Sequence, residues 1–215
     1  MFTNSITEHT LKMADHINSE YEMLHVPVIP LENAQINFCY KNVAQKVLLK
    51  GGRLQYGWIV IQSQFTVDAI HHAVWENPLG NLIDVTPSTP AFDNTLFIPD
   101  DRINYDGRVI DTIKLNITNN KIVDDFIAVD SLRNLILANT PETSEGRREV
   151  NSPLWYKYKS VGEQLVELLL EGKDQRSRCY CGSGNQYEEC HMPIIQSFMN
   201  ADRRLFADKL IRLQL

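Results

Sequence analysis

Three cysteines and one histidine gather near the C-terminal end of the sequence, at Cys179, Cys181, Cys190 and His191. Structural zinc sites take four thiolate or imidazole ligands in a tetrahedron. Two cysteines one residue apart can occupy one side of such a site. The adjacent Cys190 and His191 can complete it if the chain reverses between the pairs. Gly182 and Gly184 permit that reversal because glycine adopts positive φ freely. The pattern predicts one zinc ion.

The four predicted ligands fill a tetrahedral site and leave no position for water. We therefore expect a closed, structural zinc site and no catalysis there. Tyr187 is expected to cover one face of the metal, because so small a unit has almost no core of its own. The alternative is ordinary free thiols or a disulfide between Cys179 and Cys190. A Cys-x-Cys pair is awkward to bridge, and cytosolic thiols stay reduced.

The segment from Cys179 to His191, with its Gly182-Ser183-Gly184, resembles the SEC-C motif. This zinc-binding element occurs at the tail of the SecA translocation ATPase and at the ends of many unrelated bacterial proteins. The resemblance assigns the motif's ligands to the same four residues. It also implies a role in docking to a protein partner, as in the ATPase. A basic rim of Lys173, Arg176 and Arg178 would suit an acidic surface or ribosomal RNA, although such rims are usually only solvated charge.

The remaining cysteine, Cys39, stands alone at the predicted start of a helix over residues 38–50. A helix N-terminus favours the nucleophilic thiolate form of a cysteine. Downstream, His72 lies on a predicted strand over 69–76, and Asp84 lies on another over 81–86. These three residue types can form a catalytic triad. Cys39 would attack an amide or thioester carbonyl, His72 would take and return the proton, and Asp84 would orient the imidazole.

The turn between the two strands decides which histidine faces Asp84. Asn77-Pro78-Leu79-Gly80 fits a type I turn followed by a glycine bulge. A three-residue loop pairs Asn77 with Asn81, which makes His72 and Asp84 diagonal neighbours on one face. His71 then points to the other face, and a two-residue turn would reverse the assignment. The backbone N–H of Cys39 and the Gln35 side chain are the expected oxyanion donors.

The order Cys-helix, His-strand, Asp-strand resembles the core of the transglutaminase-like branch of papain-like thiol enzymes. Their His-Ala-Trp-like and Asp-Pro-Thr-like strands correspond here to His72-Ala73-Val74-Trp75 and Asp84-Val85-Thr86-Pro87. The sequence departs from the pattern by one residue inserted before Trp75 and by Val85 in place of proline. It also lacks a glycine-rich approach to Cys39. The resemblance implies a cysteine hydrolase, peptidase or deamidase.

Each triad residue also has a non-catalytic interpretation. A lone cysteine at a helix start is often a small buried residue, and a strand histidine beside an aspartate is often a structural hydrogen bond. The alternative function is therefore an inactive binding protein, whose zinc knuckle docks to a protein or ribosomal partner.

Hydrophobic periodicity places further elements along the chain. We expect a helix from Ile6 to Leu24 capped by Ser5, strands near 54–62, 96–98 and 109–117, and a hairpin turn at Asp106-Gly107. Helices follow over 122–137, over 154–170 and from Pro193. The predicted class is α+β, with a papain-like (transglutaminase-like) domain over 1–150, a helical linker over 151–172 and a zinc knuckle with a terminal helix over 173–215.

Composition limits the classes of function. The 215 residues are 43% hydrophobic and carry a net charge of −6. No dense basic stripe of a nucleic-acid binder is present. No apolar run is long enough to span a bilayer, and the first residues lack the features of a signal peptide. We therefore expect a cytoplasmic protein that does not enter membranes.

Overall fold

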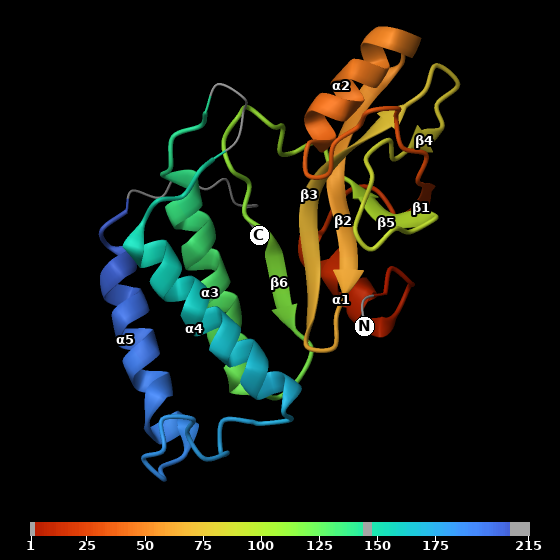
Figure 1. Ribbon diagram of the computed structural model, residues 1–215. Helices are drawn as coiled ribbons and strands as arrows, with labels where there is room; N and C mark the ends of the chain where they lie inside the picture. The colour runs from red at the N-terminus through yellow and green to blue at the C-terminus, as the bar shows by residue number, and fades with distance from the viewer. Residues whose placement is uncertain (1–2, 144–147, 207–215) are drawn as a thin grey trace. The chain divides into compact units, whose positions relative to one another are not determined.

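The computed structural model describes residues 3–143 and 148–206 (Figure 1). Its described part mixes helices and strands, in agreement with the predicted α+β class. The chain divides into two compact units after Leu115. The sequence placed this boundary near residue 150. The difference arises because helix α3 (Lys121–Ala138), expected in the first domain, packs against helices of the second unit.

The first unit is built around one sheet. Its elements are α1 (Glu8–Ile17), β1 (Leu24–Pro27), α2 (Cys39–Lys50), β2 (Arg53–Gln62), β3 (Thr66–Glu76), β4 (Leu82–Ile83), β5 (Asn94–Pro99) and β6 (Ile113–Asn116). The strand order is β1-β5-β2-β3-β4, and β6 also pairs with β3. β2 and β3 form a long antiparallel hairpin, against which α2 packs (Figure 1).

Helix α1 is shorter than predicted at both ends. Its N-cap is Thr7 rather than Ser5, and Thr7 and Thr10 cap each other through side chain and backbone. The helix closes at Asn18, which adopts the left-handed conformation with φ of 52°. Leu24 therefore begins β1 instead of extending the helix. Asparagine tolerates this conformation, so one residue stops the helix despite the apolar spacing beyond it.

The hairpin predicted at Asp106-Gly107 is wrong. β5 pairs with β1 and β2, whereas β6 pairs with β3. The Asp106 carboxylate instead accepts a hydrogen bond from the backbone of Arg108 at 3.1 Å. Asp commonly makes such local turns within loops. The chain does turn at Asp106, but this turn lies within the connection between β5 and β6 and does not join two paired strands.

β3 carries side chains that face two different cores. On one face, Ala73 and Trp75 pack with Val43 of α2 and with Val85. On the other face, Val74 packs with residues of β1 and β5. Because successive strand residues alternate between faces, His71 faces the body of α2 and His72 points to the opposite side. The first turn of α2 nevertheless reaches the His72 side, where Asn42 donates to Thr86. The two histidines therefore lie in different chemical environments.

Within the described residues, the second unit consists of helices and the cysteine cluster. Its described elements are α3, α4 (Pro153–Leu170), the short 3-10 helix η1 (Tyr187–Glu189) and α5 (His191–Arg203). α4 begins at Pro153, one residue before the predicted range of 154–170, and Ser152 is its cap. Within the described ranges, none of the helices is long and apolar enough to cross a membrane. Residues 144–147, within the predicted first domain, and the end of the predicted terminal helix lie outside the described residues.

Candidate functional site

Cys39 is the first residue of α2, as predicted. Only 7% of the surface of Cys39 is exposed to solvent. The helix begins after Phe38, which contributes no side-chain cap, and closes with Gly51 at its C-terminal end. The backbone N–H groups of a first helical turn have no partners within the helix. Cys39 therefore lies at the electropositive end of α2.

The turn after β3 has the predicted geometry. The Gly80 N–H donates to the Asn77 carbonyl at 2.9 Å, and the Asn77 N–H donates to Asn81 at 2.9 Å. Gly80 has a positive φ of 83°, which suits the predicted bulge. Trp75 consequently pairs with Ile83 in the β3–β4 ladder. This register is the one that places His72 and Asp84 on the same face.

His72 and Asp84 form a buried pair. The Nε2 atom of His72 lies 3.1 Å from Oδ2 of Asp84. The other carboxylate oxygen accepts a hydrogen bond from the Thr86 N–H at 2.9 Å. The Asp84 backbone is fixed as well, because its N–H donates to Pro27 and its carbonyl accepts from Ile29. The end of β1 therefore holds the carboxylate in place against the imidazole.

The Cys39 thiol lies close enough to His72 to influence the protonation of its imidazole. Burial alone lowers the pKa of His72, but Cys39 and Asp84 outweigh it and raise the pKa to about 10. Since Nε2 is bonded to Asp84, Nδ1 is the ring nitrogen left to exchange a proton with the thiol. The structure thus joins His72 to Asp84 by a hydrogen bond, and Cys39 influences the same imidazole.

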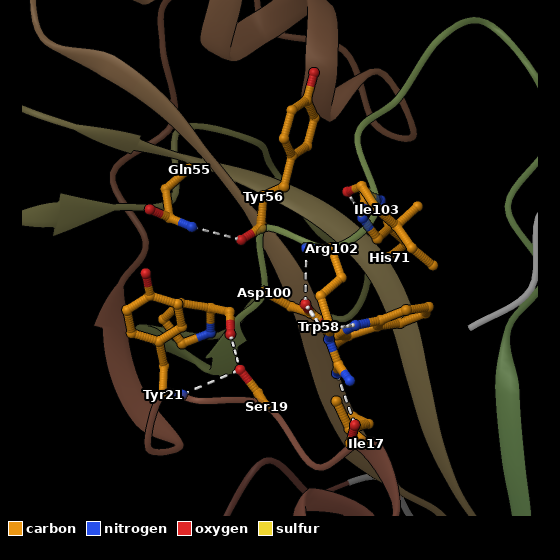
Figure 2. A network of polar contacts seen from close by, with 11 residues as sticks. Ile17, Ser19, Tyr21, Gln55, Tyr56, Trp58, His71, Asp100, Arg102 and Ile103 are labelled. Atoms are coloured by element: carbon orange, nitrogen blue, oxygen red, sulfur yellow. Dashed lines mark hydrogen bonds and ion pairs between the residues drawn. The ribbon is translucent and has the colours of Figure 1, made fainter. Parts of the chain in front are cut away.

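His71 lies in a different environment. Its Nδ1 shares a hydrogen bond with the Tyr40 hydroxyl at 2.8 Å, and its Nε2 lies 3.0 Å from the Ile103 carbonyl oxygen. Its ring also packs edge-on against Trp58 (Figure 2). Burial lowers the pKa of His71 to about 4. Both ring nitrogens are engaged, so His71 is a structural residue and a poor candidate for the base.

A polar network around Asp100 holds the segment that contains Ile103, whose carbonyl oxygen contacts His71. The Asp100 carboxylate accepts hydrogen bonds from Trp58 Nε1 at 2.9 Å and from the Arg102 guanidinium (Figure 2). Arg102 also donates to the Ile17 carbonyl at 2.7 Å, at the end of α1. Burial opposes the charge of Asp100, but the bonds from Arg102 and Trp58 hold its pKa below the ordinary value. Sequence reasoning missed this network, because its members lie far apart in the chain.

Asn42 is a second residue that sequence reasoning missed. Its Nδ2 donates to the Gln35 carbonyl at 2.8 Å and to the Thr86 hydroxyl at 3.2 Å. Its Oδ1 accepts from the Gln35 N–H at 3.2 Å. Asn42 therefore ties the loop before Cys39 to the residue that hydrogen-bonds Asp84. Its spacing of three from Cys39, on the same side of a helix, was the available signal. The Gln35 side chain itself is exposed, and its oxyanion role stays a prediction.

The predicted zinc ligands converge in the second unit. The donor atoms of Cys179, Cys181, Cys190 and His191 all lie within 4.8 Å of one another. The Cys181 and Cys190 sulfurs are 3.6 Å apart, and the Cys190 sulfur lies 3.5 Å from Nδ1 of His191. Tetrahedral zinc, with bonds of about 2.3 Å to sulfur and 2.0 Å to nitrogen, implies separations of about 3.8 and 3.5 Å. The donor set and its spacing fit a metal ion.

The chain reversal between the ligand pairs also follows the prediction. Gly182 and Gly184 both have positive φ, of 77° and 82°. The Cys179 N–H donates to the Asn185 carbonyl at 2.8 Å across the loop. His191 is the first residue of α5, so the predicted terminal helix starts two residues before Pro193.

Tyr187 makes a contact that the sequence did not predict. It is fully buried, and its hydroxyl donates to Oδ2 of Asp125 on α3 at 2.8 Å. Gln196 of α5 donates to the other oxygen of Asp125 at 2.8 Å. Tyr187 therefore anchors the cysteine loop to the helices. The aromatic ring beside a ligand is that of Tyr180, whose centroid lies 4.5 Å from that of His191.

Comparisons with protein-family models, with curated proteins and with solved structures find no match to the chain. The SEC-C and transglutaminase-like resemblances therefore rest on the sequence motifs alone.

Proposed function

We propose that the first unit is a cysteine-dependent enzyme that hydrolyses an amide or thioester, or transfers its acyl group. Cys39 is the nucleophile, His72 the base and Asp84 the orienting carboxylate. The observation that carries this proposal is the position of His72. It is buried, it is hydrogen-bonded to Asp84 through one nitrogen, and the nearby Cys39 influences its protonation.

The chemistry follows from the three side chains. The Cys39 sulfur attacks the carbonyl carbon while its proton resides on His72. The tetrahedral intermediate collapses, the bond from carbon to the leaving group breaks, and His72 gives its proton to the departing amine or thiol. Water or an amine then attacks the thioester, and His72 takes the proton of that nucleophile. Cys39 leaves as a thiolate and regains the starting state, with the imidazolium held by Asp84.

The second unit is proposed to bind one structural zinc ion through Cys179, Cys181, Cys190 and His191. Metal analysis of the purified protein should find one zinc per chain. A Cys190→Ala variant should lose the metal, because a tetrahedral site lacks a ligand. The matched control is Cys39→Ala, which removes a thiol outside the cluster and should keep the zinc. Full zinc content in Cys190→Ala would contradict the ligand assignment.

We also propose that the zinc knuckle docks to an acidic protein surface in the cytoplasm, where its thiols stay reduced. Arg176 and Arg178 support this proposal because both are exposed beside the ligands. Reversing both charges should abolish association with an isolated acidic partner while the zinc content stays unchanged. Association that survives the reversal would exclude this surface.

Thiol labelling tests the catalytic proposal against the inactive alternative. If His72 takes the proton of Cys39, this thiol should react with iodoacetamide faster than free cysteine does. The enhancement should be lost in His72→Ala and retained in His25→Ala, which removes an exposed histidine on β1. If Cys39 reacts no faster than free cysteine, the first unit is a binding domain.

A further inference from the structure

A cavity of about 210 Å³ adjoins the proposed catalytic pair. His72 and Asp84 form part of its wall, and Thr86 lies beside them. Cys39 is not among its lining residues. A group that occupies the cavity would therefore meet the catalytic residues at His72. Ligand sites are commonly concave, mostly apolar and furnished with a few polar groups.

The apolar part of the lining comes largely from aliphatic side chains. Ile70 of β3 and Ile59 and Ile61 of β2 line the cavity together. Ile70 pairs with Ile59 across the hairpin, and both lie on the His72 face of the sheet. Ile70 is 40% exposed, which is unusual for an isoleucine in a long central hairpin. Covering such surface with an apolar ligand group is favourable by about 25 cal/mol for each Å² removed from water.

The charges of the lining restrict the ligand further. Its two ionisable carboxylates are Asp84 and Asp68, and neither lysine nor arginine lines the cavity within the described ranges. Asp68 pairs through Oδ2 with Lys114 of β6, while its Oδ1 is buried without a hydrogen-bond partner. Within the described residues, the cationic group of the wall is the His72 imidazolium of the proposed mechanism, and it is already paired with Asp84. A ligand carboxylate would therefore face two carboxylates and a cation that is already neutralised. The cavity therefore disfavours an anionic group.

We propose that this cavity binds an uncharged aliphatic acyl group of the substrate and presents its carbonyl at His72 to Cys39. This inference rests on the proposed function and names its substrate class. The volume lies below the roughly 300–1,000 Å³ of typical ligand pockets, so the cavity suits a short acyl chain or one apolar side chain. Ile70 determines the length because it lies two residues from His72 on the same face.

A series of p-nitrophenyl esters tests the proposal on the full-length protein. Acylation of Cys39 should become faster from acetate through butyrate to hexanoate. Each added methylene is worth about 0.8 kcal/mol when buried, or about fourfold in kcat/KM, until the cavity is full. The ester of a chain of hexanoate length that ends in a second carboxylate should be acylated far more slowly than hexanoate.

Two variants of Ile70 test whether the chain-length preference arises in this cavity. Ile70→Trp should reduce the ratio of hexanoate to acetate rates at least tenfold by filling the cavity. Ile70→Ala should shift the preference towards octanoate. This second variant tests the same position even if Ile70→Trp fails to fold. The control Leu48→Trp changes a residue of α2 that is 88% exposed and should leave the ratio unchanged.

The outcomes separate the two proposals. If no ester acylates Cys39 above the level of Cys39→Ala, the proposed function and this inference both fall. If Cys39 is acylated but chain length has no influence, or if neither Ile70 variant changes the preference, only the cavity assignment is overturned. Faster acylation by the carboxylate-terminated ester would overturn the inferred charge of the ligand.

Discussion

The buried His71 should make the protein sensitive to mild acid. Its folded-state pKa is about 4, because burial disfavours the charged imidazolium. In the unfolded chain the value is about 6.5. The unfolded state therefore binds more protons than the folded state as the pH falls from 6.5 to 4, and the free energy of unfolding decreases over that window. At about 1.4 kcal/mol for each pKa unit, the loss is about 3 kcal/mol.

Urea unfolding of wild type and His71→Gln measures this loss. Glutamine can accept or donate similar hydrogen bonds but does not titrate, so the variant lacks this proton-linked term. Between pH 7 and pH 4, wild type should lose about 3 kcal/mol more than the variant. His72 does not add to this window, because its folded pKa of about 10 lies above the unfolded value. Its contribution is present below pH 6.5 and is lost as the pH rises towards 10.

The control is His25→Gln, which removes an exposed histidine and should follow the wild-type pH dependence. Equal losses in wild type and His71→Gln would refute the assignment of His71 as a buried neutral residue.

Three further changes probe the scaffold and the site. Gly57→Ala should lower the free energy of unfolding by at least about 2 kcal/mol in thermal denaturation, since a Cβ would lie 2.2 Å from the Ile98 carbonyl oxygen; an unchanged melting temperature would exclude this close approach. Asn42→Ala should slow iodoacetamide labelling of Cys39 because the preceding loop loses its anchor; a wild-type labelling rate would show that Asn42 is not a positioning residue. Tyr187→Phe should retain zinc yet release it faster to a chelator, because the cysteine loop loses its bond to α3; unchanged release kinetics would contradict the anchoring role.

The features that the sequence predicts correctly are those with local causes. The register of β3 and β4 follows from Pro78 and Gly80 in one short turn. The helix start at Cys39 and the reversal through Gly182 and Gly184 are also local. Each depends on residues a few positions apart, where backbone conformation and hydrogen bonding leave few alternatives.

The errors concern pairings between distant segments. β5 inserts between β1 and β2, and no local signal opposed a hairpin with the segment after Asp106. The helix over 121–138 packs with the second unit because its buried residues face α4 and α5, which single-sequence periodicity does not reveal. The anchoring of Tyr187 by Asp125 likewise joins residues far apart in the chain. Tertiary packing decides such contacts.

The most direct test of the central claim is the mass of the protein during reaction with p-nitrophenyl acetate. The account predicts that one acetyl group appears on Cys39 and is then lost by hydrolysis. It also predicts that the adduct does not form in Cys39→Ala and forms slowly in His72→Ala. Acetylation spread over surface lysines, or an adduct on Cys39 that forms at the same rate without His72, would contradict it.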